Sequence, residues 1–363
     1  MIGLGPSLAI AAAVLFGLST PLAKLLVADL SPWMLAGTLY LGSGLGLGAF
    51  RLGRGLTRPG KRGERNLRGA EWGWLLAAVA AGGIAGPVLL MIGLTSTAAS
   101  TASLLLTLEG VLTALLAWFV FQEGFDRRLV AGMAAIVAGA VALSWPGDGA
   151  APSLATLSLG GLFAGWGPPA IIGACLMWAL DNNLTRKVAL ADPVDVAMIK
   201  GLAAGSVNVA LALALGDSLP GPALMAATMA VGLLGYGVSL ALFVLALRWI
   251  GAARTGAYFS TAPFVGALAA LALFREPVTI PLLIAAALMG LGVWLHLTES
   301  HAHEHDHSDL DHDHPHVHDA HHQHEHDGPL PAAAEAAHSH PHRHRPLRHS
   351  HPHFPDAHHS HTH

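Results

Sequence analysis

The sequence has little charge, a single cysteine and no histidine before His296. Only 12% of its 363 residues are charged, about half of the roughly 25% that is usual in soluble domains. One cysteine, Cys175, excludes an intramolecular disulfide and cannot by itself form a cysteine zinc site, so we expect a small core residue there. Hydrophobic residues make up 53% of the chain, with 42 glycines. This composition predicts an integral protein of the lipid bilayer.

The formal net charge of −4 averages two unlike parts of the chain. Residues 299–363 contain 11 acidic residues and 3 arginines, together with nearly all of the histidines. Residues 1–298 contain 12 acidic residues and 16 lysines and arginines. We therefore treat the chain as an apolar, mildly basic membrane body followed by a histidine-rich tail.

Apolar runs of membrane length divide the body into ten predicted spans. A transmembrane helix needs about 20 apolar residues. The runs, five in each half, lie at 6–27, 32–50, 72–94, 100–121, 128–145, 168–187, 196–216, 222–247, 254–274 and 278–297. Glycines spaced two apart, Gly42 to Gly48, predict close helix contacts in the second run. The sequence therefore predicts an all-α protein with ten transmembrane helices, and no nucleic-acid partner.

Lysine and arginine placement predicts the orientation. Alternate connections on one side of the ten predicted spans carry thirteen of these residues, and the connections on the other side carry only Arg275. By the positive-inside rule the basic side is cytoplasmic, so both termini are expected in the cytoplasm of a multi-pass inner or plasma membrane protein. Because five is an odd number of spans, the second half must enter the membrane inverted relative to the first.

The two halves also repeat each other. Ser100–Glu123 and Ala253–Glu276 are apolar runs that begin with small residues, contain a helix-perturbing residue near the middle and end in glutamate. Repetition over about 150 residues predicts a two-repeat architecture. Inverted repeats with binding sites near the midplane are common in secondary transporters.

These features resemble EamA domains of the drug/metabolite transporter superfamily. The resemblance rests on residues 16–24 (FGLSTPLAK), on residues 178–186 (WALDNNLTR), and on the pairs Gln122-Glu123 and Arg275-Glu276. It implies four regions: 5–145 and 168–297 as five-span repeats, 146–167 as an external linker, and 298–363 as a tail. It also implies a transporter rather than an enzyme. One departure is that Pro263 of the ninth span has Glu109-Gly110 as its counterpart in the fourth.

Glu109 is the strongest candidate for chemistry in the spans. It lies about ten residues from either end of the fourth run, and a charged group there costs about 2.5–3.5 kcal/mol on insertion scales. Such a carboxyl would face a central cavity, where it would exchange a proton or meet a cationic group. The alternative is a neutral carboxyl that serves helix packing through an interhelical hydrogen bond.

Other polar residues in the spans are candidates for contacts to the solute. The amides and carboxylate of the sixth run suit a solute with amine and carboxyl groups, although they also suit interhelical bonding. Lys200 and Lys24 can reach the membrane interface by snorkelling, and Glu123 and Glu276 are expected to be structural. The candidates besides Glu109 are Trp178, Asp181, Asn182, Asn183, Lys200, Tyr236 and Tyr258.

The tail alternates histidine with aspartate and glutamate and has little to bury, so we expect it to be disordered and cytoplasmic. Imidazole and carboxylate ligands suit divalent transition metals such as Zn, Ni or Co, bound at several moderate sites, while no cofactor is required by the body. The alternative is an inert hydrophilic tail. The candidate ligands are His301, His303, His305, His307, His312, His314, His316, His318, His321, His322, His324 and His326.

Three functional hypotheses remain open. The first is a proton-coupled or facilitative exporter of a small polar metabolite, such as an amino acid or related compound, working by alternating access. The second is a transition-metal transporter in which the tail collects the ion. The third is a metal-buffering or metal-sensing membrane protein whose carrier body is vestigial. The first fits the spans best, because they contain no histidine before His296 and only one cysteine.

Overall fold

The computed structural model describes residues 4–57, 69, 71–121, 127–144, 167–185, 188, 192–297, 301–307, 310–316, 338–344 and 347–353. The chain forms two compact units, a helical unit up to Glu299 and a strand-containing unit over Ser300–Ser360.

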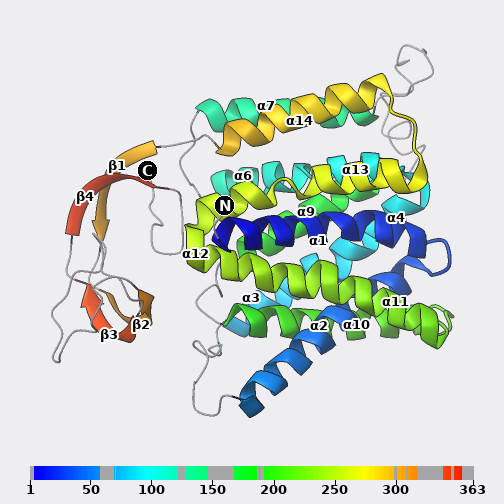
Figure 1. Cartoon of the computed structure of the whole chain (residues 1–363), viewed down its shortest axis with the longest axis horizontal. Helices are drawn as coiled ribbons and strands as arrows, with labels where there is room; N and C mark the ends of the chain where they lie inside the picture. Colours follow the sequence, from blue (N-terminus) through cyan, green and yellow to red (C-terminus); the bar gives the residue numbers. More distant parts are fainter. Residues whose placement is uncertain are drawn as a thin grey trace. The chain divides into compact units, whose positions relative to one another are not determined.

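The helical unit contains α-helices and two π-helical segments (Figure 1). They are α1 (Leu4–Leu26), α2 (Pro32–Thr57), α3 (Glu71–Ala78), η1 (Val79–Ala85), α4 (Gly86–Ser96), α5 (Ala99–Leu105), α6 (Leu108–Phe121), α7 (Arg127–Ser144), α9 (Gly167–Thr185), α10 (Pro193–Ala214), α11 (Pro222–Gly232), η3 (Leu233–Val238), α12 (Ser239–Phe259), α13 (Ala262–Phe274) and α14 (Ile280–Leu297).

Most of these helices follow the predicted apolar runs. Six helical segments among the described residues are long and apolar enough to cross a membrane, and Ala262–Phe274 and Ile280–Leu295 are shorter apolar helices. Large apolar side chains are exposed on the unit's surface, for example Phe119 and Ile280, as expected for contact with lipid. Helix α2 continues to Thr57, beyond the predicted end at residue 50. The predicted linker 146–167 lies outside the described residues except for Gly167, which begins α9.

The expected connection between the eighth and ninth spans lies inside α12, which is helical from Ser239 to Phe259. The rings of Phe243 and Phe259 are nevertheless in contact, with centroids 4.8 Å apart. Sixteen residues of straight helix would separate them by about 24 Å. The chain therefore reverses direction within α12, and the reversal keeps helical hydrogen bonding.

Two backbone irregularities occur once in each half of the helical unit. The π-helices η1 and η3 begin at Val79 and Leu233, which differ by 154 residues. Turns interrupt the helices at Leu106-Thr107 and at Ser260-Thr261, again 154 residues apart. π-Helical turns and interrupted helices expose backbone groups to other partners. The backbone thus repeats at nearly the same offset as the sequence, in which Glu123 and Glu276 are 153 residues apart.

Long helix pairs hold the unit together. Helix α2 packs along α10, α7 along α14, α1 along α12, and α4 along α9; the α7–α14 pair lies at one edge of the unit in Figure 1. Glycine makes the α2–α10 contact close: a Cβ on Gly201 would lie 2.7 Å from the Gly44 nitrogen. This confirms the helix-contact prediction for the glycine run of the second span.

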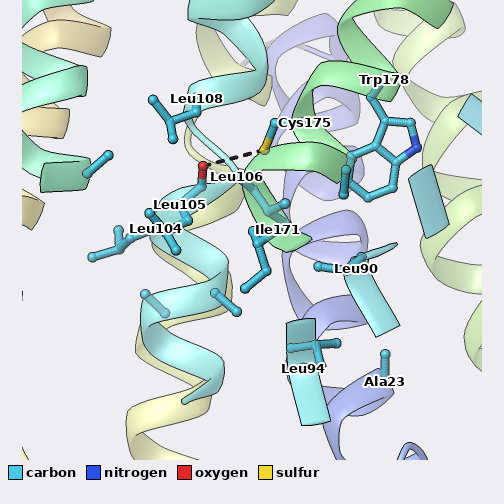
Figure 2. Packing of buried hydrophobic residues seen from close by; sticks show 14 of the residues in the cluster. Ala23, Leu90, Leu94, Leu104, Leu105, Leu106, Leu108, Ile171, Cys175 and Trp178 are labelled. Carbon is cyan, nitrogen blue, oxygen red and sulfur yellow. Dashed lines mark hydrogen bonds between the residues drawn. The ribbon is translucent and has the colours of Figure 1, made fainter. Parts of the chain in front are cut away.

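The buried core lies where α1, α4, α5 and α9 meet (Figure 2). Cys175 of α9 is fully buried there, and its thiol donates to the Leu105 carbonyl at 3.6 Å. Leu105 ends α5, so the acceptor is a carbonyl of the last helical turn, which has no partner within the helix. The thiol is a weak donor. Cys175 is therefore a core residue, as predicted, and it also bridges α9 to the interruption between α5 and α6.

The described residues of the tail unit form four short strands. Strand β1 (His301–His307) pairs antiparallel with β4 (Leu347–His353), and β2 (Leu310–His316) pairs antiparallel with β3 (His338–His344). The two-residue alternation of histidine in these stretches matches the period of a strand. The other tail residues lie outside the described ranges.

Candidate functional site

Glu109 lies at a helix start in the middle of the fourth predicted span. Helix α5 ends at Leu105, and α6 begins at Leu108, so Glu109 is in the first turn of α6. The intervening Thr107 donates its hydroxyl to the Leu104 carbonyl at 2.6 Å, and this local bond competes with a continuous helix. Backbone N–H groups at a helix start favour negative charge. The interruption therefore gives the carboxylate a favourable position that an unbroken helix would lack.

Asn182 of α9 contacts the Glu109 side chain across the helix interface. Its amide nitrogen donates to Glu109 Oε1 at 2.9 Å and to the Thr113 hydroxyl at 3.3 Å. Thr113 is one turn beyond Glu109 on α6, so the three side chains form one polar group. Glu109 is half-buried and Asn182 is exposed. The group can therefore be reached from outside the packed core.

Asp181, the neighbour of Asn182, forms a second polar group with Lys200 of α10. The Lys200 ammonium lies 2.6 and 2.7 Å from the two oxygens of the Asp181 carboxylate. Thr185 donates to Asp181 at 2.9 Å, one turn further along α9. The side chains are 10% exposed for Asp181 and 18% for Lys200. Lys200 therefore binds a neighbouring helix and does not snorkel to the interface as expected.

The π-helix η1 brings a backbone acceptor to the same region. The Gly82 carbonyl accepts hydrogen bonds from the Tyr40 hydroxyl and from Trp178 Nε1, both at 2.9 Å. A Cβ on Gly82 would overlap the Asp181 carboxylate, so only glycine permits this approach. Trp178, a predicted site residue, thus holds α9 against η1 (its ring is seen in Figure 2).

Aromatic rings lie beside the Gly82 acceptor. Tyr236 of η3 contacts the ring of Tyr40 with centroids 5.5 Å apart, and it meets Phe16 edge-on at 6.0 Å. Tyr40 was missed by the sequence analysis, although it is one of only three tyrosines. Tyr40 lies among the glycines of the second span, which predict close helix contacts. A buried phenol hydroxyl there needs a hydrogen-bond partner, so Tyr40 could have been named as a candidate from the sequence.

The hydrogen bonds of two other predicted residues involve backbone carbonyls. The Asn183 amide donates to the carbonyls of Ala179, at 2.9 Å, and Thr113, at 3.2 Å, which ties α9 to α6. Tyr258 lies at the end of α12, where its carbonyl accepts the Thr261 hydroxyl at 2.6 Å. In the described parts of the chain, no hydrogen bond joins the Tyr258 phenol to Glu109 or Asp181.

Charged residues also link the helix ends. At one end, Lys24 donates to the carbonyls of Leu94 and Thr97. At the same end, Glu276 accepts from the backbone nitrogens of Ala99, at 2.8 Å, and Ser100, at 3.1 Å. Glu276 therefore caps α5 from the other half of the chain, and Lys24 does not snorkel. Glu123 lies outside the described residues.

At the other end, Arg51 of α2 reaches two carboxylates near the start of α10. It lies 3.3 Å from Asp192 and 2.7 Å from Asp195. Within the described helices, no three His, Cys, Asp or Glu side chains are grouped so as to hold a metal ion. The predicted tail ligands from His301 to His316 are on strands β1 and β2, whereas His318, His321, His322, His324 and His326 lie outside the described residues.

Comparison with known proteins gives consistent results. The model of the EamA-like transporter family matches residues 3–145 and 165–298. An uncharacterized transporter from Methanothermobacter thermautotrophicus is 27% identical over 295 residues, which are 79% of this chain and 84% of that protein. One solved crystal structure aligns with a TM-score of 0.56 at 19% identity, covering 80% of this chain and 95% of the other. At that identity the structural match supports the fold alone.

Proposed function

Because this chain belongs to the EamA-like transporter family, we propose that it is a secondary transporter that exports a small polar metabolite by alternating access. The chain is a multi-pass membrane protein and a transporter, not an enzyme. Beyond family membership, we propose the class of solute, the direction of transport and the proton as the coupling ion. The observation that carries it is the pair of adjacent polar groups around Glu109 and Asp181.

The chemistry of these groups favours a solute with both a cationic and an anionic part. Glu109 and Asn182 offer carboxylate and amide oxygens to an amine, while the Lys200 ammonium and the Asn182 amide nitrogen suit a carboxylate. The rings of Tyr40, Tyr236 and Trp178 lie beside them and suit a short apolar part. An amino acid or a related compound combines these features.

Alternating access requires two half-structures that move relative to each other. We propose ten spans in two inverted repeats, which the recurrence of the π-helices and helix interruptions at a constant offset supports. Both termini and the tail are proposed to be cytoplasmic in the inner or plasma membrane, as the basic-residue asymmetry indicates. The Lys24 and Glu276 contacts then close the outer end, and the Arg51 contacts join α2 to α10 at the inner end.

Glu109 is the proposed proton-coupling residue. The Glu109 carboxylate accepts a hydrogen bond from the neutral Asn182 amide, whereas Asp181 is neutralised by Lys200. Protonation would remove the negative charge that attracts the amine of the solute, so proton and solute would compete for one site. Such competition couples outward movement of solute to inward movement of protons.

Metal transport through the helices has less support. A transition ion needs several His, Cys or carboxylate ligands around one point, and the described helices group no three of them. We therefore propose that divalent transition metals bind to the tail and not within the helices, and that no cofactor takes part in the transport cycle.

The test is transport by purified protein in proteoliposomes. A panel of amino acids and related zwitterions, and a panel of Zn, Ni and Co salts, would be assayed with the full chain and with a chain that ends at Thr298. We expect both forms to carry at least one zwitterionic solute at similar rates. Transport of a metal ion alone, or dependence of all transport on residues 299–363, would contradict the proposal.

Proton coupling is tested separately by Glu109→Gln. We expect this variant to exchange solute between equal pools but to lose accumulation driven by a proton gradient. Glu276→Gln is the matched control, because it makes the same chemical change at a carboxylate that caps α5. Unchanged accumulation by Glu109→Gln would assign Glu109 to packing and direct attention to Asp181.

A further inference from the structure

The packed interior of the helical unit becomes exposed at Asn182 of α9. One face of α9 carries Cys175 and Trp178, which are 0% and 8% exposed. Asn182 lies one turn after Trp178 and two turns after Cys175, so it continues this buried face, yet it is exposed. The exposed Leu176 lies about 100° round the helix from Cys175. The space in front of Asn182 is therefore an opening into the interior and not part of the surface that faces lipid.

Gly110 of α6 borders the same space. Asn182 donates hydrogen bonds to Glu109 and to Thr113, and Gly110 directly follows the first of these acceptors. Gly110 is exposed, and a Cβ added to it would have no atom within 4 Å. Gly82, in contrast, is so closely packed that a Cβ would lie 2.0 Å from a carboxylate oxygen. We call the space bordered by Asn182, Glu109 and Gly110 the inner opening.

Gly110 faces away from the lipid. Phe119 of α6 is 71% exposed, as expected for a large apolar ring in contact with lipid. It lies nine residues after Gly110, which is about two and a half helical turns, so the two residues are on opposite sides of α6. The exposure of Gly110 therefore comes from the interior. Asn182 and Gly110 lie on different helices and indicate the same opening independently.

The inner opening is closed toward the proposed outer end of the helices. Helix α9 begins there at Gly167, where a Cβ would lie 2.1 Å from the Thr97 hydroxyl. The fully buried Cys175 lies between Gly167 and Asn182 along the helix. Asn182 is about 22 Å from Gly167 at 1.5 Å per residue, toward the end where Arg51 contacts the start of α10. The structure is therefore open toward the proposed cytoplasmic end.

The second half fills the equivalent place with a side chain. At the 154-residue offset of the helix interruptions, Gly110 corresponds to Phe264 of α13. The Phe264 ring packs against the buried core and lies 3.8 Å from the position of a Cβ on Gly290 of α14. The repeat therefore has a phenylalanine at this position in one half and open space in the other. This difference is expected where a nearly symmetric protein binds one solute molecule.

We infer that Gly110 is a specificity-determining residue: the open space over it admits the solute from the cytoplasmic end and limits the size of the zwitterion that fits beside Glu109. This inference rests on the proposed transport of a zwitterion, and it adds the residue that limits solute size. A side chain at position 110 would occupy the space that larger solutes need. One methylene that no longer fits an apolar site costs about 10–200-fold in specificity.

The first test compares the smallest and the largest amino acid that the wild-type protein carries in proteoliposomes. The measured quantity is the ratio of kcat/KM for the largest to that for the smallest. We expect Gly110→Ala to lower this ratio by about 10–200-fold, and Gly110→Phe, which copies the second half, to lower it further. Alanine is more favourable than glycine within a helix, so the effect of Gly110→Ala would not come from unfolding.

The matched control is Gly73→Ala. Gly73 of α3 is also exposed, and a Cβ there would likewise have no atom within 4 Å, but its neighbours Trp72 and Trp74 are exposed large apolar residues. We expect the control to leave the ratio unchanged. An unchanged ratio in Gly110→Ala, or an equal fall in Gly73→Ala, would overturn the role of Gly110 while zwitterion transport itself stands.

The second test does not depend on the identity of the solute. With Cys175 replaced by Ala, Gly110→Cys and Leu176→Cys are treated in membrane vesicles of either orientation with a charged methanethiosulfonate reagent that cannot cross the bilayer. The reagent reacts with the thiolate, which forms where water reaches the sulfur. We expect Gly110→Cys to be labelled, and only from the end at which Arg51 lies, while the lipid-facing Leu176→Cys stays unlabelled.

The labelling separates failure of this inference from failure of the proposed function. Equal labelling of the two cysteine variants, or labelling of Gly110→Cys from the other end, would overturn the inner opening whatever the solute is. Labelling as expected, in a protein that carries no amino acid, would instead overturn the proposed function and with it the assignment of a zwitterion to this space.

Discussion

The two helical halves of this protein, residues 4–144 and 167–297, share their backbone irregularities but differ in their buried charges. Each half has one π-helix and one interrupted helix, at positions that differ by 154 residues. At the same offset, Glu109 corresponds to Pro263, and the matching segments 178–186 and 16–24 align Asp181 with Ser19. The repeated backbone thus provides the scaffold, and single-copy side chains provide the polar groups.

This difference is expected of a nearly symmetric scaffold that binds an asymmetric solute. A solute with an amine at one end and a carboxylate at the other needs opposite charges at two places. Identical side chains in both repeats would present the same charge twice. The comparison of the halves therefore separates residues that shape the helices from residues that select the solute, and the following substitutions test that separation.

The largest effect is expected from Asp181→Ala. It leaves the Lys200 ammonium in place without its carboxylate, and removing one member of a buried ion pair costs about 3–5 kcal/mol. Thermal unfolding of the purified protein in detergent should show a clear loss of stability. The double variant Asp181→Val with Lys200→Met should recover most of it while transport stays low. A single variant as stable as the wild type would show that the pair is not coupled.

The next effect concerns the interruption in the first half. Glu109→Pro copies the residue of the second half into the first turn of α6, where proline is tolerated. It removes the hydrogen bond from the Glu109 nitrogen to the Leu106 carbonyl, which contributes about 1 kcal/mol. We expect a folded protein without solute transport. Leu112→Pro, inside α6, is the control and should cost about 3 kcal/mol or more; similar losses for both variants would mean that the helix is not interrupted at Glu109.

A smaller effect is expected where the second half caps the first. Glu276→Ala removes the acceptor for the backbone nitrogens of Ala99 and Ser100 at the start of α5. Loss of a helix cap costs about 0.5–2 kcal/mol. Thermal unfolding should therefore shift less than in Asp181→Ala. Hydrogen exchange should rise at Ala99 and Ser100, and an unchanged exchange rate there would contradict the capping role.

The smallest effect is expected from Pro263→Ala. Pro263 lies in the first turn of α13, where its missing N–H has no helical partner to lose. Its contribution is mainly a restriction of the unfolded chain, which is about 0.4–1 kcal/mol. Transport should be retained and unfolding should shift slightly. Loss of transport in this variant would mean that proline itself, and not the turn at Ser260-Thr261, shapes the second half.

Much of the fold was predictable because the bilayer imposes a simple rule on sequence. A spanning helix must be apolar over about 20 residues, so α1, α7, α9 and α10 lie within a few residues of the predicted runs. The interruption of the ninth span near Pro263 was also visible. The reversal within α12 and the extension of α2 to Thr57 were not, because helical hydrogen bonding continues through both.

The sequence by itself determined the membrane class, the two-half plan and the identity of the rare polar side chains, because each depends on composition or on local spacing. Only the tertiary structure decided which of these side chains meet. Glu109 and Asn182 are 73 residues apart in the chain, and Tyr40 and Gly82 are 42 apart. Such contacts depend on how α6, α9, α2 and η1 pack, and the Gly82 carbonyl becomes an acceptor for two side chains at a π-helical turn. Long-range packing therefore determined the candidate site, whereas the requirements of the bilayer determined the helices that build it.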